Sequence, residues 1–190
     1  MKQHRIAIFA SGNGSNAENI VKHSEDVESI VVKSIFTNNL QAGVIERAKR
    51  LEIPFSTFSK KELSESSFVN SLLENYDYII LAGFLLLVPS ILIKHFRNRI
   101  INLHPSLLPK FGGKGMYGMN VHEAVVQAGE KESGITIHLV NEEYDKGRVL
   151  FQAKLDIPQN ETAENLASKI HQLEYEYFPK VIFDYILGSK

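Results

Sequence analysis

The chain has 190 residues, of which 44% are hydrophobic, so we expect a single domain with one sizeable core. Its formal net charge of -1 provides no basic surface for phosphates, so no nucleic-acid partner is predicted. The absence of cysteine excludes disulfides, thiolate metal sites and a cysteine nucleophile. The N-terminal stretch has no cleavable apolar segment, and the longest apolar run is interrupted by Gly83 and Pro89. We therefore expect a cytoplasmic protein without a membrane partner.

Strand-like and helix-like stretches alternate through the first half of the chain. Nearly continuous apolar runs predict strands, and apolar residues at helical intervals predict helices between them; the main stretches are 5–10, 16–23, 27–38, 41–52, 53–58 and 76–83. Such runs are typical of strands that helices cover on both faces. We predict an α/β fold, with a doubly wound, mostly parallel sheet that extends at least to Asn102.

The last third of the chain has a different pattern. A helix is predicted around residues 121–129, followed by strands at 134–140 and 148–157. The short joint NEEYDKG between these strands favours an antiparallel hairpin appended to the parallel sheet. A long final helix is predicted from about Thr162 to Leu187.

A glycine-rich loop follows the first predicted strand. In FASGNGSNAENI, Gly12, Gly14 and Ala17 match the pattern G-x-G-x-x-G/A, in which glycines let the backbone approach a phosphate at a helix N-terminus. No Gly-Lys-Ser/Thr follows at the spacing of a nucleotide-triphosphate loop. The pattern alone is a weak indication of a dinucleotide site.

The second predicted strand makes a dinucleotide ligand less plausible. It ends with Asn38 and Asn39, where a nicotinamide enzyme needs an acidic residue for the ribose hydroxyls. What remains is a nest for a smaller phosphate, to which Ser15 and Asn16 could add side-chain hydrogen bonds. The alternative is a tight strand-to-helix turn that Ser15 or Asn16 caps.

The stretch INLHPSLLP places an amide and an imidazole two residues apart. Asn102 and His104 share one face of a predicted strand, and Pro105 keeps His104 extended, while Pro109 stiffens the exit. An imidazole can take and return a proton, and an amide N–H can hold a developing oxyanion. The pair suits acyl transfer without a covalent enzyme intermediate, since no G-x-S-x-G motif is present. The alternative is a structural histidine at a strand end.

Asp145 lies in the joint of the predicted hairpin. Asp-Lys-Gly is typical of a turn, and the neighbouring acidic residues would then form a solvated tip. If Asp145 instead lies near His104, its carboxylate would stabilise the imidazolium and raise the pKa of His104. No metal site is predicted, because His122 and Glu123 lack the second histidine of the zinc helix motif.

Together these motifs resemble the folate-dependent formyltransferases, and among them the phosphoribosylglycinamide formyltransferases. The similarity rests on SGNGSN, LAGF, INLHPSLLPKF and the downstream D-x-G hairpin, and it covers essentially the whole chain. It implies a single formyltransferase domain over residues 1–190, with a Rossmann-like fold. It also implies transfer of a formyl group from 10-formyltetrahydrofolate, the cosubstrate, to the amine of glycinamide ribonucleotide (GAR) in purine synthesis.

The resemblance also implies roles for individual residues. Asn102 would hold the formyl oxygen, His104 would handle protons, and Asp145 would orient or charge His104. The remaining expected contacts are to GAR through Asn13, Gly14, Ser15, Asn16, His171 and Glu174, and to the folate through Leu85, Leu86, Leu87, Val88, Asn102, Asn141, Glu142, Glu143 and Tyr144. For Glu174 the alternative is an exposed helix face, and for residues 84–89 it is a place in the core.

Two departures from many relatives affect these expectations. Leu86 occupies a position where many relatives have an arginine, so another group would have to hold the folate's glutamate tail, and Lys60, Lys61 or a residue elsewhere could do so. The loop at 111–120 is longer and richer in glycine, and we expect it to close over bound substrates as a lid, or else to pack permanently on the surface or at a subunit contact. The functional alternatives are a formyltetrahydrofolate hydrolase and a non-enzymatic phosphosugar-binding module. A monomer and a homodimer are both compatible with the sequence.

Overall fold

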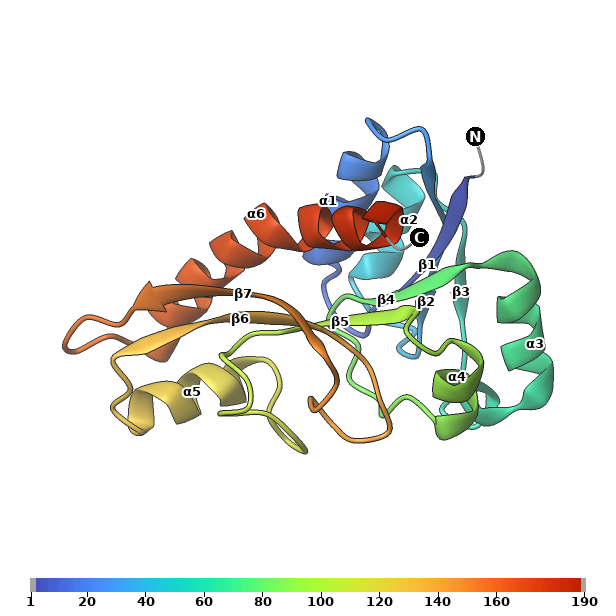
Figure 1. Ribbon diagram of the computed structural model, residues 1–190. Coiled ribbons are helices and arrows are strands. Elements are labelled where there is room, and N and C mark those ends of the chain that lie inside the picture. Colours follow the sequence, from blue (N-terminus) through green and yellow to red (C-terminus); the bar gives the residue numbers. More distant parts are fainter. Residues whose placement is uncertain (1–2, 189–190) are drawn as a thin grey trace. The chain divides into compact units, whose positions relative to one another are not determined.

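The chain divides into two compact units, residues 1–102 and 103–190. The computed structural model describes residues 3–188 of the chain. Figure 1 shows its helices and strands.

The first unit is built on parallel strands. They are β1 (His4–Phe9), β2 (Ile30–Thr37), β3 (Phe55–Thr57), β4 (Tyr78–Leu81) and β5 (Ile100–His104), in the spatial order β3-β2-β1-β4-β5. The last two residues of β5 already belong to the second unit. All of β4 and the last four residues of β1 are buried, as expected for strands covered on both faces. The uninterrupted apolar runs therefore predicted the centre of this sheet correctly.

Helices cover both faces of these strands. They are α1 (Ser15–Ser24), α2 (Val44–Arg50), α3 (Ser66–Asn75) and α4 (Ser90–His95), with a short 3-10 helix at Glu62–Ser64. α1 contacts α2 and α3 contacts α4, and the two pairs lie on opposite sides of the strands (Figure 1). This confirms the doubly wound arrangement. The loops after β1, β2 and β4 consequently share the carboxyl edge of the strands, where open α/β sheets bind their ligands.

The second unit combines a hairpin with two helices. It contains α5 (Met119–Gln127), β6 (Glu132–Leu139), β7 (Val149–Asp156) and α6 (Ala163–Gly188). β6 and β7 pair antiparallel, with a register irregularity between Ile137 and His138. α6 contacts both strands and α5. The antiparallel hairpin and the long final helix are confirmed.

Residues 3–188 contain neither a membrane-spanning helix nor a cluster of metal-binding side chains. No helix in that range combines the length and the apolar character that a membrane span requires. The same range holds no group of three or more histidine, aspartate or glutamate side chains placed to bind a metal ion. The expectation of no metal stays a prediction.

Candidate active site

The glycine-rich loop joins β1 to α1 through a backbone that requires glycine. Gly14 is the N-cap of α1 and has φ 78°, a left-handed conformation that other residues rarely adopt. A Cβ at Gly14 would also lie 2.3 Å from Cγ2 of Val44 on α2. Because glycine has no capping side chain, the turn is not the Ser15- or Asn16-capped structure considered from the sequence. A phosphate nest at this loop stays a prediction.

Ser11 forms hydrogen bonds that join the loops after β1, β2 and β4 at the carboxyl edge of the first unit. Its Oγ donates to Oδ1 of Asn38 at 2.6 Å and accepts from the backbone N–H of Leu85 at 3.0 Å. Its backbone N–H donates to the Gly83 carbonyl at 3.0 Å. Asn38, which replaces the acidic residue of a dinucleotide site, thus has a structural role in fixing the glycine-rich loop. Sequence patterns did not indicate Ser11, because the contact partners are far away along the chain.

The apolar segment after β4 divides into exposed and buried positions. Leu85 and Leu87 are 50% and 48% exposed, whereas Val88 is buried. Phe84 packs edge-on against Phe9 with ring centroids 5.4 Å apart, which anchors the start of the segment. The alternative of a core segment therefore holds for Val88 but not for the two exposed leucines. They form an apolar surface at a strand exit.

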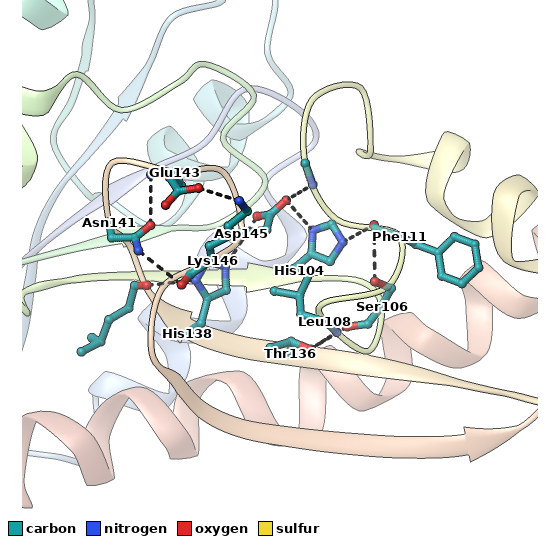
Figure 2. Close-up of polar contacts among 12 residues, drawn as sticks. His104, Ser106, Leu108, Phe111, Thr136, His138, Asn141, Glu143, Asp145 and Lys146 are labelled. Carbon is teal, nitrogen blue, oxygen red and sulfur yellow. Dashed lines mark hydrogen bonds and ion pairs between the residues drawn. The ribbon is translucent and has the colours of Figure 1, made fainter.

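His104 lies in the second unit, and each of its two ring nitrogens faces a polar group of the protein (Figure 2). It is 3% exposed, and its Nε2 lies 2.8 Å from the Phe111 carbonyl oxygen. Since a carbonyl can only accept, Nε2 carries a proton. Nδ1 faces Oδ2 of Asp145 at 3.6 Å, too long for a direct hydrogen bond but close enough for a strong charge interaction once His104 is protonated. The expected proximity of His104 and Asp145 is therefore found.

The pKa of His104 differs from the sequence-based expectation. Burial lowers it below its ordinary value, and His138 acts in the same direction, although Asp145 and the Phe111 carbonyl favour the charged form. A carboxylate near His104 was expected to raise its pKa, and that contribution is present but is outweighed by desolvation. His104 is consequently neutral at pH 7, with an acceptor lone pair at Nδ1 directed toward Asp145. It is ready to take a proton.

Asp145 lies between two histidines rather than beside one. Its Oδ1 is 3.6 Å from Nε2 of His138, whose own Nδ1 donates to the Leu139 carbonyl at 3.0 Å. The Gly113 N–H donates to Oδ2 at 2.8 Å. Burial would raise the pKa of Asp145, but His138, the Gly113 N–H and His104 together outweigh it and lower the pKa. Asp145 is thus a buried carboxylate that stays ionised at neutral pH, not a solvated tip.

The loop after His104 is fixed by two strand residues. Thr136 on β6 donates its hydroxyl proton to the Ser106 carbonyl at 2.7 Å and accepts from the Leu108 N–H at 3.0 Å. Gln152 on β7 donates to the Leu108 carbonyl at 3.0 Å and to Oγ1 of Thr136 at 2.8 Å. These contacts hold the path of PSLLP and thereby the orientation of the preceding histidine. Figure 2 includes the Thr136 contact.

The glycine-rich segment after Pro109 begins in direct contact with this pair. Phe111 and Gly113 supply the backbone groups that bind His104 and Asp145. The segment ends at Gly118, because Met119 and Asn120 already belong to α5. The lid predicted at 111–120 is therefore shorter than its expected bounds, and whether it moves stays a prediction.

The joint between β6 and β7 is organised by its own side chains. Asn141 accepts from the Glu143 N–H at 3.1 Å and donates to the Lys146 carbonyl at 3.2 Å. Glu143 pairs with Lys146, and Tyr144 is exposed. Since Asn141 and Glu143 are engaged within the loop, backbone groups are the better candidates for ligand contacts here.

His171 and Glu174 meet on α6, one helical turn apart. Nδ1 of His171 lies 2.9 Å from Oε2 of Glu174, and the Glu174 side chain is 13% exposed. Glu174 is therefore not on an open helix face.

His122 on α5 lies close enough to both Glu174 and His104 for each to influence its charge. It is 6% exposed, and among the described residues its Nδ1 has no hydrogen-bond partner. Burial lowers the pKa of His122, Glu174 acts to raise it, and His104 acts to lower it. Its position on the predicted helix did not distinguish His122 from a core residue, so no sequence pattern indicated these interactions.

Comparisons with known proteins agree with this arrangement. The family model described as formyl transferase matches residues 4–182. The Arabidopsis thaliana protein named phosphoribosylglycinamide formyltransferase, chloroplastic, is 40% identical in an alignment 190 residues long that covers 95% of this chain. The Bacillus subtilis protein named phosphoribosylglycinamide formyltransferase is 36% identical, with 94% of this chain and 92% of that protein covered.

Solved structures give the same result. The crystal structure of phosphoribosylglycinamide formyltransferase from Bacillus halodurans superimposes with a TM-score of 0.86 at 33% identity, covering 98% of this chain and 97% of that one. The chain spans 65% of the length of the Arabidopsis relative. Because the family model and the bacterial relatives extend over nearly all of the sequence, the chain belongs to the formyl transferase family.

Proposed function

We propose that the protein transfers the formyl group of 10-formyltetrahydrofolate to the primary amine of GAR, giving formyl-GAR and tetrahydrofolate in de novo purine synthesis. The observation that carries this proposal is the buried His104, with Nε2 bonded to the Phe111 carbonyl and Nδ1 directed at Asp145. Membership of a family that uses a formyl-folate cosubstrate supports the donor. The names of the relatives from Arabidopsis and Bacillus subtilis support the acceptor.

The proposed chemistry assigns one task to each of three residues. The GAR amine attacks the formyl carbon, and the Asn102 amide N–H holds the oxygen as it gains negative charge. His104 accepts the proton that leaves the attacking nitrogen, and Asp145 stabilises the resulting imidazolium. Collapse of the tetrahedral intermediate breaks the bond to N10 of the folate, and the imidazolium returns the proton to N10. Protons therefore balance over the reaction.

GAR binding is proposed for residues in both units. The loop residues Asn13, Gly14, Ser15 and Asn16 bind its phosphate, a role supported by the glycine N-cap of α1. His171 and Glu174 bind the rest of GAR, supported by their mutual contact at 2.9 Å and the low exposure of Glu174.

Folate binding is proposed for two loops. The exposed leucines of the segment Leu85, Leu86, Leu87 and Val88 offer apolar contact to the flat pterin ring. Backbone groups of Asn141, Glu142, Glu143 and Tyr144 add polar contacts, and Asn102 contacts the formyl group. Leu86 offers no charge for the glutamate tail, so the tail is held elsewhere.

Further expectations concern organisation and place in the cell. We propose that the two compact units act together as one formyltransferase domain over residues 1–190. A cytoplasmic location stays a prediction, since the Arabidopsis relative is named chloroplastic. The oligomeric state stays as expected from the sequence, a monomer or a homodimer.

The decisive experiment measures tetrahydrofolate formation spectrophotometrically with 10-formyltetrahydrofolate, in the presence and absence of GAR. Turnover should require GAR and should collapse in His104→Ala, but it should persist in the control His95→Ala, which removes an exposed histidine. Turnover without GAR would instead identify a hydrolase. GAR binding without any turnover, unchanged by His104→Ala, would identify a phosphosugar-binding module.

A further inference from the structure

Arg47 on α2 donates hydrogen bonds to Asn13, the exposed residue at the centre of the glycine-rich loop. Its Nε lies 2.8 Å from the Asn13 carbonyl oxygen and 3.1 Å from Asn13 Oδ1. Its Nη2 donates to the same Oδ1 at 2.5 Å. One guanidinium thus binds both oxygens of a single asparagine, in the fork geometry that makes arginine hydrogen bonds strong and directional.

The loop and α2 are also in direct backbone contact. The Val44 N–H donates to the Gly12 carbonyl at 3.1 Å. A Cβ at Gly43 would lie 3.3 Å from Cα of Asn13, and one at Gly14 would overlap Val44. These contacts place the start of α2 against the loop, so a side chain one turn further along the helix can reach Asn13.

A buried carboxylate holds the other end of the guanidinium. Nη1 of Arg47 contacts Oε2 of Glu18 on α1, and Nη2 of Arg50 lies 2.6 Å from the same oxygen. Nζ of Lys22 lies 2.8 Å from the other carboxylate oxygen, Oε1. The Glu18 side chain is largely shielded from solvent. Contacts with α1 and with the loop therefore hold the Arg47 guanidinium in place.

This geometry determines which part of the Asn13 amide can serve a ligand. An asparagine amide offers an oxygen that accepts and a nitrogen that donates, and it can rotate to exchange them. Arg47 occupies the oxygen. The amide nitrogen, with its two hydrogens, is then the group that remains for an anion, whereas a flipped amide would present an oxygen that repels phosphate.

We propose that Arg47 is a positioning residue for phosphate recognition: it locks the Asn13 amide with its N–H groups available to the substrate phosphate. The inference rests on the proposed function, because it takes GAR as the substrate. Arg47 acts through Asn13 and makes no contact with the reacting atoms. Its loss should weaken binding of the phosphate while leaving the chemical step intact.

The test compares Arg47→Gln and Arg47→Lys with Arg50→Gln. Arg50 is a matched control, because it binds the same Glu18 oxygen from the same helix, but within residues 3–188 it makes no hydrogen bond to Asn13. We expect Arg47→Gln to raise KM for GAR about tenfold, the typical effect of losing a charge-assisted hydrogen bond, with kcat and KM for the folate unchanged. Arg47→Lys should recover part of the loss, since an ammonium restores the charge but not the fork. Arg50→Gln should keep the KM of the unaltered chain.

Two further measurements separate positioning from a general structural effect. Turnover of glycinamide riboside, which lacks the phosphate, should be equal in the unaltered chain and in Arg47→Gln. In an Asn13→Ala background, adding Arg47→Gln should raise KM for GAR no further, because the pair acts as one unit.

The outcomes distinguish this inference from the proposed function. If the unaltered chain turns over GAR but Arg47→Gln keeps its KM, or loses the riboside reaction equally, the positioning role is overturned while the function stands. An equal effect in Arg50→Gln would also overturn it. If the unaltered chain turns over no GAR at all, both proposals fall. Should Arg47→Gln fail to fold, Arg47→Lys and Asn13→Ala give the same decision.

Discussion

Replacing Asp145 with asparagine removes the charge beside His104 and keeps the shape of the side chain. An asparagine oxygen can still accept from the Gly113 N–H, and asparagine tolerates the positive φ of 55° at this position. Two unit charges 3.6 Å apart attract by roughly 4–5 kcal/mol at an effective dielectric constant of about 20. If His104 carries between half and all of a unit charge in the transition state, Asp145→Asn lowers kcat by roughly 50- to 2,000-fold.

The pH profile provides a second readout of the same change. His104 must be unprotonated to act as a base, so the rate falls on the acidic side below its pKa. Asp145 acts to raise the pKa of His104, so its removal should move the acidic limb to lower pH. Steady-state rates of Asp145→Asn across pH measure both effects.

A matched control lies in the same loop. Glu143→Gln removes a carboxylate that pairs with Lys146 at the surface, and it should leave kcat and the pH profile unchanged. The reasoning is refuted if Asp145→Asn lowers kcat by less than about fivefold, if the acidic limb moves upward, or if Glu143→Gln produces an equal loss.

Three further predictions concern stability. Hydrogen bonds, first from Lys22 and then from two arginines, lower the pKa of Glu18 from 4.5 to about 2. The ionised Glu18 therefore stabilises the fold above pH 4.5, and this stabilisation is lost as the pH falls toward 2. Glu18→Gln should therefore flatten the dependence of Tm on pH in that range. The same slope of Tm against pH in Glu18→Gln and in the unaltered chain would contradict this. Thr136→Val leaves the buried Leu108 N–H unpaired and should lower the free energy of unfolding by about 1–3 kcal/mol in urea titrations, whereas an unchanged midpoint would refute it. His122→Leu removes a buried nitrogen that has no hydrogen-bond partner among the described residues, so Tm should rise, and an unchanged or lower Tm would contradict this.

The parallel sheet followed from local patterns in the sequence. Continuous apolar runs identified the strands because strands covered on both faces need apolar side chains throughout, as in β4. The alternation rule placed Asn102 and His104 on one face of β5 without any knowledge of the tertiary structure. The contact between His171 and Glu174 was not predicted, although their spacing of three residues on a helix is one that brings side chains together.

Contacts between residues distant in sequence could not be read from those patterns. His138 is a single polar residue in the apolar run GITIHLV, and its place opposite Asp145 depends on how β6 continues into its loop. Arg47 resembles any charged residue on an amphipathic helix, although it binds Asn13. The direction of the His104 pKa also required the structure, because burial outweighs the neighbouring charge.

The backbone contacts of Phe111 and Gly113 divide the glycine-rich segment into two parts. Residues 111–113 bind His104 and Asp145, whereas Tyr117 lies beyond these contacts and is half exposed. Because the chain has no cysteine, Tyr117→Cys would introduce a single thiol for a fluorescent label. Such a label would report movement of residues 114–118 during turnover without altering the groups proposed to carry the proton.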